Sequence, residues 1–462
     1  MKKNLFLVAI PLLALILGWT LWNTGFAVPI AWTAAITFWV ACWWIAEPIP
    51  IPATSLLPMA LFPLVGVLTP GQIAESYGNP LILLLLGGFM LSVGMEKSGA
   101  HRRIALRMVS LFGGQSGQGG RKLVFGFMAA SAILSMWISN AATTLMLLSI
   151  AMAVIAQTNN VQLRTALLLG IAYAASVGGI GTPVGTPPNL VFFQVYEENT
   201  GREPSFLQWM LWTVPVVFVM LPVVGFWLTR RLGKVEPIEL PSVGPWRSAE
   251  VRTLLVFGVT ALLWVTRIQP LGGWSGLLGL SEANDASVAL MGVLAMFVIP
   301  AGGSNKSERL LDWKSASRIP WGILLLFSGG ICIAKAFVVS GLSGWLGEQL
   351  AGLGTLPLLL IVGIICLAVT FLTELTSNTA TTTLLLPILA AAALSAEINP
   401  LLVMVPATIS ASFAFMLPVA TAPNAIVFGS GELTVKKMAR EGVVLNLIGT
   451  VVVTLICYLL LE

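Results

Sequence analysis

Long apolar runs fill most of the chain, and short groups of small polar residues interrupt them at a few places. Three runs, at residues 5–22, 209–228 and 443–461, are each long enough to cross a hydrocarbon core of about 30 Å as a helix. Along the chain this pattern predicts about eleven spans, with further apolar pieces broken by Gly and Pro. The pattern therefore predicts an all-α integral membrane protein.

Three blocks of sequence occur twice, in the same order. The matching pairs are Gly87-Gly88 with Gly329-Gly330, Ser139-Asn140 with Ser377-Asn378, and GTPPN at 185–189 with ATAPN at 420–424. The offset between the copies stays between 235 and 242 residues. Three blocks at a nearly constant offset indicate that the chain consists of two structural repeats.

The charge pattern places the two copies on opposite sides of a membrane. Basic residues follow the first Gly-Gly block, at 101–114, whereas the matching segment at 342–354 has no Lys or Arg. Because basic loops stay in the cytoplasm, this difference predicts inverted-topology repeats. We assign them to residues 1–232 and 253–462, with a cytoplasmic linker at 233–252. In the cytoplasmic (inner) membrane, the N-terminus would then lie inside and the C-terminus outside.

Composition supports a membrane protein and limits the possible partners. The chain is 57% hydrophobic and 9% charged, whereas soluble domains carry about 25% charged residues. The net charge of +5 could indicate a nucleic-acid partner, but most basic residues lie in loops, where the positive-inside rule places them. We therefore expect a lipid bilayer and no nucleic acid. The four cysteines lack CxxC spacing and are predicted to be packing residues.

The N-terminal apolar run has two possible interpretations. A basic start followed by an apolar segment is also typical of a cleavable signal. The run lacks a convincing small-residue cleavage site and is long enough to span a membrane. We therefore expect a retained first helix.

Two kinds of interruption are predicted in each repeat. The Ser-Asn pairs divide apolar segments and are expected at the tips of two re-entrant helical hairpins. The Pro-Asn motifs interrupt a span outright, because Pro lacks an N–H and clashes with the preceding helical turn. Unwound backbone at membrane depth has to be buried in protein or to line a watery cavity.

Together the four interruptions predict one polar centre near the middle of the membrane. Each helix N-terminus carries about half a positive charge, which suits an anion. Free backbone carbonyls in the same breaks suit a hard cation such as sodium. A single Ser, Thr or Asn in a membrane helix more often only joins neighbouring helices, but matched motifs in both repeats favour a binding site.

Glu374 is an acidic residue close to the second Ser-Asn pair. An ionisable residue within a membrane is a candidate for function. Glu374 could orient the hairpin tip, or it could bind a proton or a cation, and the sequence leaves both interpretations open.

The motifs together resemble the divalent anion/sodium symporter family, and in particular its bacterial sodium/dicarboxylate members. The resemblance rests on Ser-Asn-Thr at 377–379, TPPN at 186–189, WWIAEPIP at 43–50 and PVATAPNAIVFGSG at 418–431, and it covers nearly the whole chain. It implies a homodimer, with scaffold helices followed by a hairpin and a broken helix in each repeat. It also implies an elevator movement of the transport domain, driven by more sodium ions than are needed to neutralise the substrate, and no organic cofactor.

The resemblance also implies site residues. A first sodium site would involve Ser135, Ser139, Asn140 and Gly185, and a second would involve Thr373, Thr376, Asn378 and Ala420. The substrate would contact Ser139, Asn140, Ala141, Thr186, Ser377, Asn378, Thr379, Thr421 and Ala422. Many members of the family carry C4-dicarboxylates such as succinate, malate and fumarate.

Two positions depart from the family pattern. Ala141 stands where the pattern has Thr, and Ala422 stands where TPPN would place Pro. Losing one neutral hydrogen bond costs about 1 kcal/mol, which is enough to shift selectivity. Sulfate or another anion, and sodium-independent exchange instead of symport, therefore stay open.

Two other classes of function fit the sequence less well. A membrane-embedded enzyme is disfavoured, because the sequence has no HExxH, no GxSxG and no dense cluster of carboxylates or His. A passive channel is disfavoured, because inverted repeats with paired hairpins are typical of alternating access. The leading prediction is sodium-coupled uptake of a C4-dicarboxylate.

Overall fold

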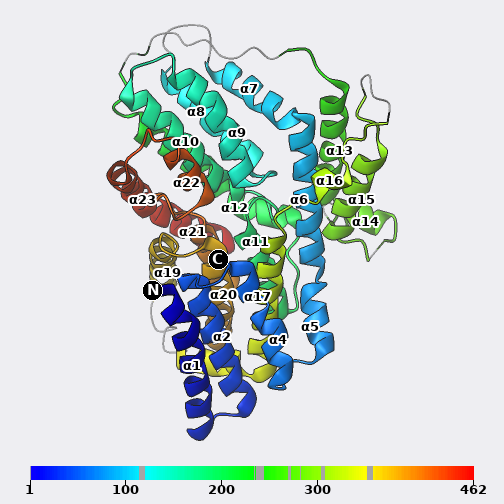
Figure 1. Cartoon of the computed structure of the whole chain (residues 1–462), viewed down its shortest axis with the longest axis vertical. Helices are drawn as coiled ribbons and strands as arrows, with labels where there is room; N and C mark the ends of the chain where they lie inside the picture. The colour runs from blue at the N-terminus through cyan, green and yellow to red at the C-terminus, as the bar shows by residue number, and fades with distance from the viewer. Residues whose placement is uncertain are drawn as a thin grey trace.

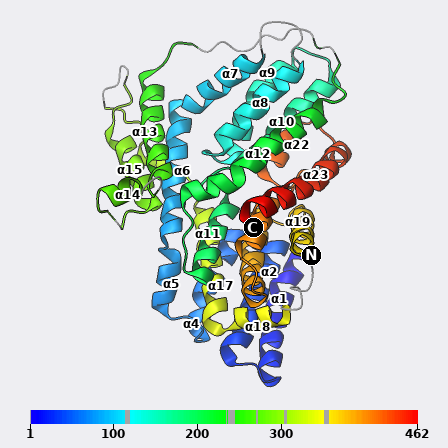
Figure 2. The same cartoon turned by 180° about the vertical axis from the view of Figure 1, so that it is seen from behind.

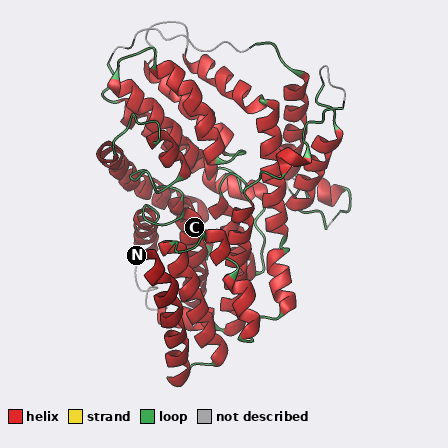
Figure 3. Cartoon of the chain, in the orientation of Figure 1, coloured by secondary structure: helices red, strands yellow, loops and turns green. Residues whose placement is uncertain are grey.

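The computed structural model describes residues 2–113, 120–233, 235, 244–268, 272–280, 282–302, 307–350 and 357–462. Within these ranges the regular structure is α-helical, apart from an isolated bridge between Pro300 and Arg309. Figure 3 shows helices joined by loops throughout this part of the chain.

The first half of the chain forms twelve helices. They are α1 (Lys2–Asn23), α2 (Val28–Ala46), α3 (Ile51–Thr54), α4 (Leu57–Leu64), α5 (Pro70–Tyr77), α6 (Pro80–Ser98), α7 (Ala100–Gly113), α8 (Gly120–Ser135), α9 (Asn140–Ile155), α10 (Val161–Gly179), α11 (Pro187–Thr200) and α12 (Phe206–Thr229).

The second half forms the remaining helices. They are α13 (Ser248–Val265), α14 (Gly273–Leu277), α15 (Asp285–Val298), α16 (Trp313–Ala316), α17 (Trp321–Ser340), α18 (Leu342–Leu350), α19 (Leu358–Leu372), α20 (Asn378–Ser395), α21 (Leu401–Ala411), α22 (Ala422–Phe428) and α23 (Val435–Leu461).

The three long apolar runs seen in the sequence are helical, within α1, α12 and α23. By length and composition, nine stretches of the described residues are long and apolar enough to cross a membrane. Shorter apolar helices, among them α9, α15, α19 and α21, accompany them. The protein is therefore a multi-pass membrane protein, as predicted, while the total of eleven spans stays a prediction.

Helices from the two ends of the molecule meet near its middle. In Figure 1, α8, α9 and α10 lie towards the top, and α1, α2 and α4 lie at the bottom. The view from behind shows α10 towards the top and α11 below it (Figure 2). The segment between α10 and α11 is almost wholly buried, so its backbone needs partners other than water.

The predicted interruptions coincide with helix ends. Helix α9 begins at Asn140 and α20 at Asn378, so each Ser-Asn pair straddles a helix start. Pro187 opens α11 and Pro423 lies in the first turn of α22, where a missing N–H costs nothing. The local sequence thus accounts for all four helix starts.

Small residues allow neighbouring helices to come close to both helix breaks. A Cβ on Gly178, in α10, would lie 2.2 Å from the Ala132 oxygen of α8. A Cβ on Gly442, in α23, would lie 2.1 Å from the Phe415 oxygen. Because both distances are far shorter than an atomic contact, only Gly allows these approaches. Small residues at helix contacts are typical of membrane proteins.

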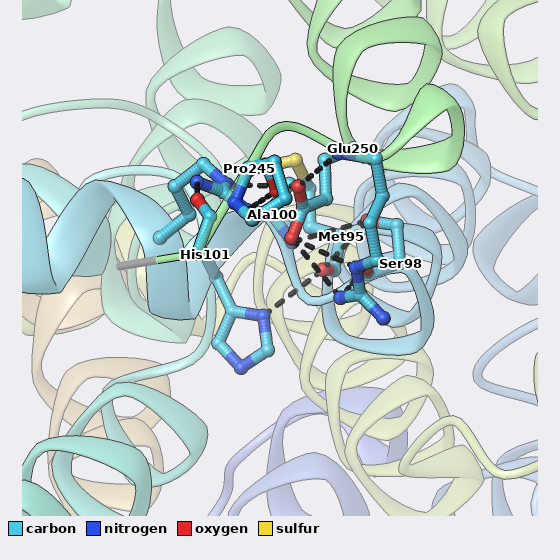
Figure 4. A network of polar contacts seen from close by, with 9 residues as sticks. Met95, Ser98, Ala100, His101, Pro245 and Glu250 are labelled. Carbon is cyan, nitrogen blue, oxygen red and sulfur yellow. Dashed lines mark hydrogen bonds and ion pairs between the residues drawn. The ribbon is translucent and has the colours of Figure 1, made fainter. Parts of the chain in front are cut away.

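A polar network fixes the start of α7 against α13 (Figure 4). The side chain of Arg103, in α7, donates from Nε to Glu250 Oε2 at 2.8 Å, and both side chains are buried. Arg103 also donates to the Pro245 oxygen, and Arg247 Nη2 donates to the Ser98 oxygen at 2.9 Å. These bonds tie α7 to the segment that leads into the second half of the chain.

Candidate functional site

A cavity of about 630 Å³ brings the four interruptions together. Both Ser-Asn pairs line it, as do residues 185–188 and 420–423 of the two helix breaks, along with the C-terminal end of α2, part of α6 and the start of α17. The predicted site residues that line the cavity are Ser139, Asn140, Ala141, Gly185, Thr186, Thr376, Ser377, Asn378, Thr379, Ala420, Thr421 and Ala422. Motifs more than 200 residues apart in the sequence therefore share one space.

Ser135 and Thr373 are the two predicted residues that are not among the lining residues. Both are fully buried, and each contacts the Asn of its own motif. They lie behind the cavity wall, where their hydroxyls position the Asn side chains.

In the first motif, Asn140 is held by hydroxyl groups from both flanking helices. Ser135 Oγ, at the end of α8, donates to Asn140 Oδ1. Thr144 Oγ1, in α9, donates to the Asn140 backbone oxygen at 2.7 Å. Ser139 Oγ accepts from the N–H of Ala142 at 3.2 Å and so caps α9. The sequence folds this way because a small hydroxyl residue stands at each of the three positions.

The second motif repeats the two bonds to the Asn, while Ser377 makes no side-chain cap to α20. Thr373 Oγ1 lies 2.7 Å from Asn378 Oδ1 and also 2.9 Å from the Ala411 oxygen. Thr382 Oγ1 donates to the Asn378 backbone oxygen at 2.6 Å. In both motifs the hydroxyl group that contacts Oδ1 belongs to the fifth residue before the Asn, and the one that donates to the Asn oxygen belongs to the fourth residue after it.

The two helix breaks are stapled by the Asn of their Pro-Asn motifs. Asn189 Nδ2 donates to the oxygens of Gly179, at 3.1 Å, and Thr182, at 2.7 Å. Asn424 Nδ2 donates to the oxygens of Ala414 and Leu417, at 2.9 and 3.0 Å. Both Asn side chains are 0% exposed. Each staple satisfies carbonyls that a helix would otherwise pair, so the break is a fixed structure.

Sequence reasoning did not assign this role to Asn189 or Asn424. The signal was available, because both Asn residues belong to the repeated Pro-Asn motif. What the sequence could not supply was their partners, which lie seven and ten residues back across an interrupted helix.

Backbone carbonyls approach the first break closely at Gly185. A Cβ there would lie 2.4 Å from the Gly179 oxygen and 3.0 Å from the Met136 oxygen. Gly185 thus allows the hairpin tip and the break to present carbonyl oxygens beside Asn140. Oxygen ligands of this kind suit a hard cation.

Glu374 contacts the second break. Its carboxylate accepts from the N–H groups of Met416, at 2.8 Å, and Leu417, at 2.9 Å, and from Asn446 Nδ2, at 2.7 Å. Asn446 lies in α23 and its Oδ1 accepts from the N–H of Phe415. Glu374 thus joins the end of α19 to the break that follows α21, and its role in binding a proton or a cation stays a prediction.

The electrostatics of the cavity come mainly from helix ends. Among the described residues that line it, Glu47 is the only charged side chain. Helices α9, α11 and α20 begin at the cavity, and each contributes partial positive charge. Such a cavity can hold an anion through N–H groups, hydroxyls and amides, and a cation through carbonyl oxygens.

The chain is similar to a known family along nearly its whole length. It matches a family described as the sodium:sulfate symporter transmembrane region over residues 2–460. The chain belongs to this family. Its members are transporters, and the resemblance seen in the sequence is thereby confirmed at the level of the family.

Curated members of the family include close relatives in staphylococci. A sodium-dependent dicarboxylate transporter of Staphylococcus saprophyticus is 41% identical over 448 residues, which cover 92% of this chain and 85% of the relative. The transporter of the same name in Staphylococcus aureus is 40% identical over 446 residues, covering 92% and 84%.

The fold has a solved counterpart. The crystal structure of the YdaH transporter of Alcanivorax borkumensis superposes with a TM-score of 0.58, covering 86% of this chain and 88% of the other. The two sequences are 15% identical, so this likeness concerns the fold alone.

Proposed function

We propose that this protein carries C4-dicarboxylate anions such as succinate, malate or fumarate into the cell together with sodium ions. One observation carries the proposal: both Ser-Asn motifs and both helix breaks line one cavity that has no Lys or Arg among its described lining residues. A dianion held there has to be neutralised by helix ends and by bound cations. The names of the staphylococcal relatives support the same substrate and ion.

The substrate carboxylates would contact the two motif amides. Because a hydroxyl group contacts Oδ1 of Asn140 and of Asn378, Nδ2 is the amide atom left to donate to a carboxylate. Ser139, Ser377 and Thr379 would add hydroxyls, and Thr186 and Thr421 lie on the facing walls. Ala141 and Ala422 would shape the cavity without adding a polar group.

The sodium ions would occupy the places where the hairpin tips meet the breaks. The first site would use Ser135, Ser139, Asn140 and Gly185, and the second would use Thr373, Thr376, Asn378 and Ala420. Hydroxyl, amide and carbonyl oxygens are the ligands that a hard cation prefers. In each site the Asn oxygen would contact the cation while its nitrogen contacts the substrate, which couples the two binding events.

The finer architecture belongs to the same proposal. It comprises about eleven spans and two re-entrant hairpins, α8–α9 and α19–α20, in inverted repeats. The homodimer would be held by scaffold helices, and the hairpins and broken helices would move as an elevator. The basic segments around α7 and α13 would lie in the cytoplasm and Glu462 outside.

Uptake by the purified protein in liposomes tests the proposal. With an inward sodium gradient, labelled succinate should accumulate above its equilibrium level. With a potassium gradient, no such accumulation should occur. Equal uptake in both conditions would exclude sodium coupling, and liposomes preloaded with succinate would then show whether the protein is a sodium-independent exchanger.

Sulfate is the second candidate substrate, because the family description names it. Ala141 removes a hydroxyl at the position where the family pattern has Thr, so selectivity at this wall is open to change. Excess unlabelled succinate and sulfate should be compared as competitors. Dicarboxylate uptake requires that succinate inhibit strongly and sulfate weakly.

A further inference from the structure

The two helix breaks differ in one acidic residue. Met136 and Glu374 occupy matching positions, each three residues before the Ser of its motif. Met136 contributes its backbone oxygen, which accepts from Thr182 Oγ1. Glu374 contributes a carboxylate, and the residue as a whole is 3% exposed. The second repeat therefore contains a buried acidic group where the first has a neutral side chain.

All the hydrogen bonds that Glu374 accepts from described residues come from neutral donors. The donors are the N–H groups of Met416 and Leu417 and the amide of Asn446. In the part of the chain that the structure describes, no Lys, Arg or His forms an ion pair with Glu374. Neutral donors stabilise a carboxylate without cancelling its charge. The charge of Glu374 thus remains available to attract a cation.

Glu374 lies next to the proposed second cation site. It directly follows Thr373, whose Oγ1 lies 2.7 Å from Asn378 Oδ1. It also holds Leu417, three residues before Ala420, the other proposed ligand on the break. The attraction between opposite charges falls with distance and is strongest where water is excluded. The charge of Glu374 would therefore attract a cation at the second site far more strongly than a cation at the first.

We propose that Glu374 makes the cation site of the second repeat the stronger of the two and the first to fill. The inference rests on the proposed function, since it assumes one cation site in each repeat. Filling the second site first fixes Asn378 before the substrate arrives. The first site, with Met136 in place of a carboxylate, fills later. Glu374 acts here through the attraction of its charge across a short distance and is not itself a ligand of the cation.

Sodium-dependent thermal stabilisation of the purified full-length protein tests the role of the charge. Sodium chloride is titrated against choline chloride at constant ionic strength and without substrate, because a ligand that binds the folded state raises its stability. Glu374→Gln should raise the sodium concentration for half-maximal stabilisation at least tenfold, while Glu374→Asp should stay within threefold of the wild type. A neutral variant with an unchanged midpoint would overturn the proposal.

A matched control separates charge from packing. Asn446→Ala removes a hydrogen bond to Glu374 but keeps the carboxylate. It should lower the melting temperature while leaving the sodium midpoint within threefold of the wild type. If Asn446→Ala and Glu374→Gln shift the sodium midpoint equally, the role of Glu374 is only structural and the proposal is wrong.

The order of filling is tested without altering Glu374, so the proposal stays testable if Glu374→Gln does not fold. Asn140→Ala should keep the high-affinity phase of sodium stabilisation, and Asn378→Ala should lose it. Equal loss in both variants, or the reverse pattern, would contradict the proposal. If the wild type itself shows no sodium-specific stabilisation, the proposed function fails; a wild-type response with no shift in Glu374→Gln overturns this inference alone.

Discussion

The two regions that line the cavity share the hydrogen bonds that hold their Asn residues but have different neighbours. In each, a hydroxyl group contacts the motif Asn and an Asn staple closes the helix break. The first region adds Ala141 and Met136, and the second adds Thr379 and Glu374. The shared bonds fix the backbone geometry, whereas the differing side chains set what each region binds and how tightly.

The comparison of the two regions shows which positions of a duplicated site can differ between its copies. Bonds that satisfy buried carbonyls are kept in both regions, because an unpaired buried polar group costs about 1–3 kcal/mol. Positions on the cavity wall, such as Ala141 and Thr379, differ more freely, since their side chains border open space and satisfy no buried carbonyl. Variants at matching positions therefore test whether the two regions behave alike.

The largest effect is expected at the motif amides. Asn140→Ala and Asn378→Ala each remove an oxygen for the cation and a nitrogen for the substrate, so sodium-driven succinate uptake should fall by about a hundredfold or more. Initial rates in liposomes at saturating sodium measure this. Thr158→Ala, a hydroxyl deletion outside the cavity lining, serves as the control. Normal uptake in both Asn variants would show that the cavity is not the transport site.

A large effect on stability is expected at the two Asn residues that close the helix breaks. Asn189→Ala and Asn424→Ala each leave two buried backbone carbonyls without their donor, which should cost about 2–4 kcal/mol of stability. Thermal unfolding in detergent measures the loss. If the two breaks are equivalent, the variants should destabilise alike. A much milder effect of Asn424→Ala would show that Glu374 and Asn446 hold the second break without its staple.

The sequence predicted the motifs and the helix ends well, because both depend on local chemistry. Pro187 and Pro423 each lie in the first turn of a helix, where Pro is favoured, and Ser139 caps α9 with its own side chain. The repeats also indicated which segments belong together. The binding roles of the individual residues stay predictions.

The sequence could not predict the contacts that decide how the second break is held. Asn446 lies 72 residues from Glu374, and the bond between them exists only because α23 packs against the break. Likewise, the Tyr173 hydroxyl donates to the Phe415 oxygen across 242 residues. Hydropathy alone also does not fix the number of spans. Helices α9 and α21 are apolar but shorter than a typical span, so whether they cross the membrane depends on their packing.

A moderate effect is expected from crowding Asn140. A Cβ on Gly179 would lie 2.6 Å from Asn140 Oδ1 and 2.9 Å from Nδ2, so Gly179→Ala should displace the amide. The sodium concentration for half-maximal uptake should rise by roughly tenfold, since one charge-assisted contact is weakened. Gly363→Ala is the matched control, because its added Cβ would meet only Thr454, at an ordinary 3.7 Å. Equal sodium dependence in the two variants would mean that the Asn140 amide does not contribute to the cation site.

The smallest effect is expected from making the two motifs alike. Ala141→Thr adds a hydroxyl to the cavity wall at the position that matches Thr379. One added neutral hydrogen bond is worth about 1 kcal/mol, which corresponds to roughly fivefold in affinity. The KM for succinate should therefore fall a few-fold if the substrate contacts this wall, with the sodium dependence unchanged. Thr379→Ala should raise it by a similar factor. A lower KM in Ala141→Thr together with a higher KM in Thr379→Ala would show that the substrate contacts both repeats. A change of KM in Thr379→Ala alone would place the substrate against the second repeat.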